Sequence, residues 1–103
     1  MKVIEITKEN YQKEIENAEG KIFIDFYADW CMPCKRMSPI VDQIAEENPD
    51  VKFVKVNIDE NEDLARTYGI MSIPTFVYME DGAVVSKKIG MMPKEELMNL
   101  IKK

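Results

Sequence analysis

The 103-residue sequence predicts an α/β fold in which helices cover both faces of a mixed sheet. Two observations support this prediction. Strand and helix patterns alternate over roughly the first two thirds of the chain, which is typical of parallel strands joined by helices. Two further strand patterns, at 75–79 and 83–89, are then separated by Glu80-Asp81-Gly82, which predicts an antiparallel hairpin.

Local signals predict the first three elements. Residues 3–6 predict a short strand, and Thr7 is a suitable N-cap for a helix that runs to about Ala18. Gly20 then ends this helix. The segment 22–28 is an almost continuous apolar run, which is the pattern of a central strand buried on both faces.

A second helix is predicted directly after the two cysteines. Pro39 lies within its pattern and predicts a kink, and Asn48-Pro49-Asp50 ends it. Segment 51–57 predicts the third strand. The apolar residues that recur at helical spacing are Met37, Ile40, Val41, Ile44 and Ala45.

Two shorter helices complete the pattern. Residues 59–62 have capping-box spacing for a helix that ends before Gly69. Pro93 suits the first turn of a terminal helix. The apolar residues of that helix are Leu97, Met98, Leu100 and Ile101.

Length and composition predict one domain that spans residues 1–103, with no linker or internal repeat. The net charge of −5 and the pI near 4.8 argue against nucleic acid or an anionic membrane as partners. The charged N-terminus does not resemble a signal peptide, which favours a cytoplasmic protein, although a secreted protein after signal removal would look the same. No long apolar helix face is left uncovered, so we expect a monomer.

The segment Trp30-Cys31-Met32-Pro33-Cys34-Lys35 holds both cysteines and opens the second helix. The N-terminus of a helix favours a thiolate over a thiol, so Cys31 is the candidate nucleophile. Cys34 lies one turn later on the same helical face, from which it can attack the mixed disulfide that Cys31 forms with a substrate. This spacing predicts thiol exchange.

Two structural roles compete with this interpretation. A structural disulfide here would close a four-residue loop, which stabilises a protein by only about 2 kcal/mol. A zinc site normally needs four Cys or His ligands, and the chain has no His and no third Cys. We therefore expect no metal, and a redox-active pair.

Asp25 lies in the middle of the apolar strand 22–28. An unpaired, ionised carboxylate in the core costs several kcal/mol, so burial would raise its pKa. The alternative is an edge position that faces water. A residue that costs this much free energy to bury suggests a functional use.

Several segments, 25–35, 56–59, 68–70 and 73–76, together with Pro39 and Gly90, match one family pattern in order. On these residues the chain resembles the thioredoxin family along essentially its whole length. The resemblance implies a thioredoxin fold, with a central five-stranded mixed sheet flanked by four helices and the cysteines at the edge of a shallow groove.

The resemblance also implies roles for individual residues. Asp25 would exchange a proton with Cys34, and Lys55 would neighbour Asp25 and modulate its protonation, although a solvated lysine is the default interpretation. Pro74 would follow a cis peptide bond and leave the backbone of Ile73 free to pair with an extended substrate. The residues expected to rim the substrate groove are Trp30, Met32, Pro33, Ile73, Gly90 and Met91.

Two residues depart from the family pattern. Met32 stands where these proteins usually carry glycine, and Tyr27 where many carry tryptophan. Met71 and Met92 are expected near the groove, which would give it four flexible thioethers, although methionine more often fills gaps in a core.

The implied function is reduction of disulfide-containing substrate proteins, with a thioredoxin-reductase-like electron donor and no bound cofactor besides the Cys31–Cys34 pair. Such a protein takes part in electron transport and redox homeostasis. A thiol oxidant or isomerase of the same fold is the alternative within this chemistry. A binding module whose thiols are incidental is the alternative from another class.

Overall fold

The computed structural model describes residues 3–101, so the two residues at each end of the predicted domain lie outside the described part. A five-stranded mixed sheet has the order β1-β3-β2-β4-β5. The thioredoxin fold is confirmed. The elements are β1 (Val3–Glu5), η1 (Gln12–Glu16), β2 (Lys21–Tyr27), α1 (Met32–Glu47), β3 (Val51–Asn57), α2 (Glu62–Thr67), β4 (Thr75–Glu80), β5 (Ala83–Ile89) and α3 (Lys94–Met98).

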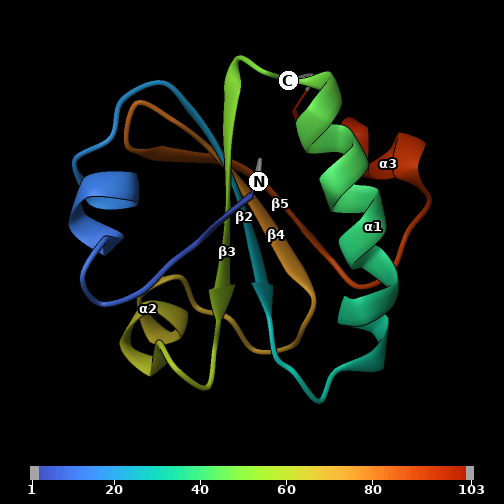
Figure 1. Cartoon of the computed structure of the whole chain (residues 1–103), viewed down its shortest axis with the longest axis horizontal. Coiled ribbons are helices and arrows are strands. Elements are labelled where there is room, and N and C mark those ends of the chain that lie inside the picture. The colour runs from blue at the N-terminus through green and yellow to red at the C-terminus, as the bar shows by residue number, and fades with distance from the viewer. Residues whose placement is uncertain (1–2, 102–103) are drawn as a thin grey trace.

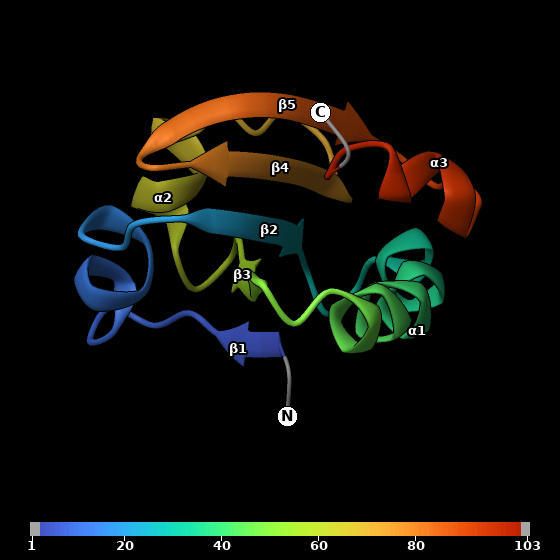
Figure 2. The same ribbon diagram turned by 90° about the horizontal axis from the view of Figure 1, so that it is seen from above.

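Helices cover both faces of the sheet. β1, β3 and β2 run parallel, whereas β4 and β5 run antiparallel to their neighbours. α1 and α3 pack on one face, and η1 and α2 lie on the other (Figures 1 and 2). α1 follows β2 directly, so the start of α1 lies at the carboxyl end of a central strand, where open α/β sheets place their sites.

The apolar core has one cluster on each face of the sheet. Phe23 and Phe53 stack with ring centroids 4.8 Å apart beneath α1 and α3. Ile22, Ile24 and Phe26 face the opposite cluster, with η1 and α2. β2 is buried because one apolar cluster covers each of its faces, as its apolar sequence predicts.

Local sequence signals predicted several boundaries well. β3 has the predicted bounds, and Pro39 lies inside α1 as expected. Asp81 and Gly82 both have positive φ, 50° and 86°, which is the two-residue hairpin geometry that Asp-Gly favours. Pro93 caps α3.

Two helix starts differ from the prediction. Thr7 and Asn10 do cap each other's backbone N–H groups, but the helical segment η1 covers only Gln12–Glu16. The capping box at 59–62 does not form, since α2 begins at Glu62 after Asn61, which makes no side-chain cap bond. The Asp59 carboxylate instead accepts a hydrogen bond from the indole of Trp30, which is distant in the sequence.

Candidate functional site

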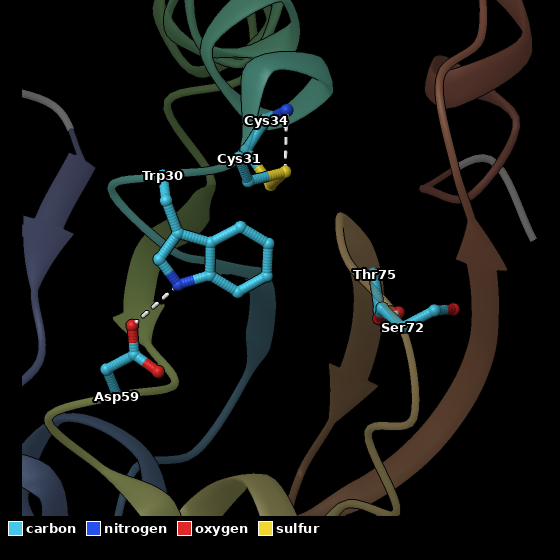
Figure 3. Close-up of a disulfide and its surroundings, with 6 residues drawn as sticks. All are labelled: Trp30, Cys31, Cys34, Asp59, Ser72 and Thr75. Atoms are coloured by element: carbon cyan, nitrogen blue, oxygen red, sulfur yellow. Dashed lines mark hydrogen bonds between the residues drawn. A yellow bond between two sulfur atoms is a disulfide. The ribbon is translucent and has the colours of Figure 1, made fainter.

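Cys31 and Cys34 form a disulfide at the N-terminus of α1, with their Cα atoms 5.3 Å apart. Cys31 is the N-cap residue of the helix, and its Sγ accepts a hydrogen bond from the backbone N–H of Cys34 at 3.1 Å (Figure 3). A sulfur in this position receives both a backbone donor and the positive end of the helix dipole. The arrangement therefore favours a thiolate at Cys31 when the disulfide is reduced.

The disulfide is recessed, whereas the residues on either side of Cys31 are exposed. Cys31 and Cys34 are only 4% and 5% exposed, but Trp30 is 68% exposed and Met32 also projects from the surface. The sulfurs pack with Ala28 and against the side chain of Ile73. A partner must therefore approach through this rim of apolar side chains to reach the sulfurs.

The loop before β4 lies beside the disulfide. Its Ile73–Pro74 peptide bond is cis, as the resemblance implied. The Thr75 hydroxyl donates a hydrogen bond to the Ser72 carbonyl at 2.6 Å (Figure 3). The Gly90 N–H donates to the Pro74 carbonyl at 2.8 Å. These two bonds restrain the loop around the cis peptide bond.

The backbone of Ile73 is available for pairing. Within residues 3–101, neither its N–H nor its C=O makes a hydrogen bond, although its side chain packs against the cysteines. An extended peptide could pair with these groups in the manner of an added strand. Thr75, which restrains this loop, carries no local sequence signal for that role.

The orientation of Trp30 is set by Asp59. The indole Nε1–H donates to the Asp59 carboxylate at 2.9 Å, and Figure 3 shows the ring lying between this carboxylate and the loop of Ser72 and Thr75. Sequence reasoning missed this contact. The available signal was topological, because residues that follow the parallel strands β2 and β3 meet at the same edge of the sheet.

Replacing Asp59 with Ala is expected to release the Trp30 ring from its orientation. The loss of one exposed, charge-assisted hydrogen bond should lower kcat/KM for protein disulfides roughly two- to five-fold. Trp30 emission, which reports the only tryptophan, measures the change directly. Asp63→Ala, which removes a carboxylate paired with Arg66 in α2, is the matched control, and an effect of equal size there would contradict the prediction.

Asp25 lies behind the disulfide on the face of β2 that α1 covers. It is 7% exposed, and its Oδ1 is buried without a hydrogen-bond partner. A pocket of about 120 Å³ joins it to Cys34 and Lys55. Burial raises the pKa of Asp25 to about 7, and the Lys55 charge acts in the opposite direction with a smaller effect. The prediction of a buried position for Asp25 is therefore confirmed.

Lys55 adjoins Asp25, but its ion pair is elsewhere. The two residues are register partners on β3 and β2. The Lys55 ammonium instead pairs with the Glu5 carboxylate at 3.7 Å and lies 5.7 Å from the centre of the Tyr27 ring. Sequence reasoning gave no role to Glu5.

The predicted methionine rim is only partly correct. Met32, Met71 and Met91 are exposed, and Met91 follows Gly90, which is bonded to the cis-proline loop. Met92 is buried in the core cluster with Leu97, so its placement near the groove was wrong. The apolar contact that α3 makes with the sheet takes this side chain inward.

The thioredoxin family model matches residues 2–103. The chain belongs to the thioredoxin family. It is 39% identical to a thioredoxin of Bacillus subtilis over 104 aligned positions, covering all of this chain and 98% of that protein. It is 44% identical to a thioredoxin of Chlamydia pneumoniae (95% and 94% covered) and 42% identical to one of Listeria monocytogenes (98% and 97% covered).

Membership and the paired cysteines together make this protein a thiol-disulfide oxidoreductase of the protein-disulfide reductase type. The family in general acts on protein disulfides, receives electrons from a reductase, and uses its own redox-active disulfide rather than a separate cofactor. In the described part of the chain, no helix has the length and apolar character needed to cross a bilayer.

Proposed function

We propose that this protein reduces disulfides in other proteins, with Cys31 as the nucleophile and Cys34 as the resolving thiol. The hydrogen bond from the Cys34 N–H to the Cys31 Sγ supports this assignment most directly, because it stabilises negative charge on that sulfur. Cys34 lines the pocket that also holds Asp25. The two thiols thus have different surroundings that suit different steps.

In the first step, the Cys31 thiolate attacks one sulfur of the substrate disulfide. A mixed disulfide forms, and the first substrate thiolate leaves and takes up a proton from solvent. Asp25 then accepts the proton of the Cys34 thiol, and the Cys34 thiolate attacks the Cys31 sulfur. The second substrate sulfur leaves as a thiolate and takes up the proton that Asp25 accepted, and Cys31–Cys34 becomes the disulfide. Two electrons pass to the substrate, and a separate reductase of the thioredoxin-reductase kind restores the dithiol.

The substrate would bind as an extended segment along Ile73. Its backbone groups have no partner within the described residues, so an added strand would satisfy them with little demand on substrate sequence. Pro74 fixes the loop, while the groove is rimmed by Trp30, Met32, Pro33, Gly90 and Met91. Flexible methionine side chains suit varied partners.

We place this activity in cytoplasmic electron transport and redox homeostasis, carried out by a monomer with one domain over residues 1–103. The acidic net charge of −5 favours soluble protein substrates over nucleic acid or anionic lipid.

An equilibrium titration of the Cys31–Cys34 pair against glutathione, followed by Trp30 fluorescence, tests the proposed direction. We expect a potential near or below about −250 mV, as for a cytosolic reductant. A value of about −180 to −120 mV would instead assign the protein to the oxidants and isomerases. If the pair shows no reversible exchange, the catalytic assignment fails and the binding-module hypothesis stands.

A further inference from the structure

Three charged residues form a row across the strands β1, β3 and β2. Glu5 is the register partner of Lys55, and Lys55 is the register partner of Asp25. Register partners on parallel strands project to the same face of a sheet. One ammonium therefore lies between two carboxyl groups that compete for it.

Lys55 pairs with Glu5 rather than with Asp25. The Lys55 ammonium is 3.7 Å from the Glu5 carboxylate, and within residues 3–101 it forms no ion pair with Asp25. Asp25 Oδ1 consequently has no partner. The Glu5–Lys55 pair is already neutral, so a proton on Asp25 leaves the whole row without net charge.

Tyr27 strengthens this arrangement. Its hydroxyl donates to the Glu5 carboxylate, with distances of 2.8 and 2.9 Å to the two oxygens. Its ring lies 5.7 Å from the Lys55 ammonium, within the range of a cation–π contact. Burial and the bond to Glu5 both raise the pKa of Tyr27, so it remains a donor at neutral pH.

We propose that Glu5 and Tyr27 are positioning residues that hold the Lys55 ammonium at Glu5, so that Asp25 can bind and release the proton of Cys34. This inference rests on the proposed role of Asp25. Without the Glu5 carboxylate, Lys55 has only Asp25 as an anionic neighbour in the row. Asp25 would then remain ionised and retain protons poorly at neutral pH.

Several titratable and charged groups act on Asp25, and in each comparison only the substituted residues differ. The titratable and charged groups that face it are Lys55 from β3, Glu5 from β1, Asp29 after β2, and Cys34, Lys35 and Asp42 from α1. β4 contributes Phe76, which is uncharged. Glu5 and Asp42 disfavour the Asp25 carboxylate directly, so the direct effect of Glu5 must be separated from its effect through Lys55.

The test is a titration of Asp25 followed by the NMR signal of its carboxyl carbon. The oxidised protein is used because its cysteines do not titrate. In Glu5→Gln we expect the Asp25 midpoint to fall by about one pH unit, because Lys55 turns to Asp25. In the Lys55→Gln background, the same substitution is expected to move the midpoint far less. Tyr27→Phe should shift it in the same direction as Glu5→Gln.

Each comparison can overturn the proposal. An unchanged midpoint in Glu5→Gln, or an equal shift with and without Lys55, would show that Glu5 does not act by holding Lys55. An unchanged midpoint in Tyr27→Phe would remove Tyr27 from the assignment. Glu96→Gln is the matched control, since it removes one carboxylate 3.8 Å from Lys88, another lysine, and should leave Asp25 unaffected.

The titration is independent of the proposed catalytic role. If Asp25→Asn protein reduced substrates at the wild-type rate at pH 7, the role of Asp25 in proton transfer would fail. The midpoint in Glu5→Gln would still decide whether Glu5 positions Lys55. A purely structural role for Glu5 would lower thermal stability without moving the Asp25 midpoint.

Discussion

Replacing Cys31 with Ser is expected to abolish reduction of protein disulfides. A serine hydroxyl is not ionised at neutral pH and cannot form the mixed disulfide, so the backbone donor at the start of α1 has no thiolate to stabilise. Loss of a catalytic nucleophile lowers turnover by on the order of a thousand-fold or more. Reduction of insulin by the prereduced protein measures the effect.

Cys34→Ser is the matched variant, because it makes the same change of atom three residues away. It keeps the attacking thiol but lacks the resolving one, so turnover should also fail, while a covalent adduct with the substrate accumulates. Non-reducing electrophoresis and mass spectrometry would detect the adduct. If Cys31→Ser trapped substrate and Cys34→Ser did not, the assignments of the two cysteines would be reversed.

Asp25→Asn is expected to stabilise the folded protein strongly at alkaline pH. The Asp25 pKa is raised from its ordinary value of 3.8 to about 7, mainly by burial. Between these values the folded state binds a proton that the unfolded state has released, so wild-type stability falls as pH rises through this window. A difference of this size amounts to about 4 kcal/mol above pH 7, which the neutral amide avoids.

Urea unfolding of the oxidised protein at several pH values measures this effect. The free energies of unfolding of the two proteins should nearly coincide below pH 4 and diverge steadily up to pH 8. Asp50→Asn, on the surface and paired with Lys21, is the control and should change stability by about 0.5 kcal/mol or less. A constant difference in the free energy of unfolding between Asp25→Asn and wild type at every pH would show that ionisation of Asp25 does not cause the pH dependence of stability.

Sequence reasoning succeeded where the determining interactions are local or periodic. The alternation of apolar residues predicted β3 to its ends, and Asp81-Gly82 predicted a tight hairpin because few residues tolerate positive φ. The pairing of Cys31 with the start of α1 is likewise a short-range property, since the N-cap and its donor are three residues apart. Resemblance to the family added the cis bond before Pro74.

The failures concern side chains whose surroundings are set by tertiary packing. Asp59 had the spacing of a capping box, but the indole of Trp30 at the same edge of the sheet takes its carboxylate. Met92 was expected near the groove, yet it completes the core beneath α3. At Asp59, a local capping preference worth about 1 kcal/mol yields to a contact that only packing creates.

The sequence by itself determined the α/β class, the order of strands and helices, the cysteine pair at a helix start and the burial of one carboxylate. These features depend on periodicity, turn chemistry and the cost of placing charge in an apolar strand. Only the tertiary structure decided that Lys55 pairs with Glu5 rather than Asp25. The sheet aligns three strands that are distant in the sequence. Which of the two carboxyl groups pairs with the lysine depends on distance and desolvation, and no single segment of the sequence encodes either.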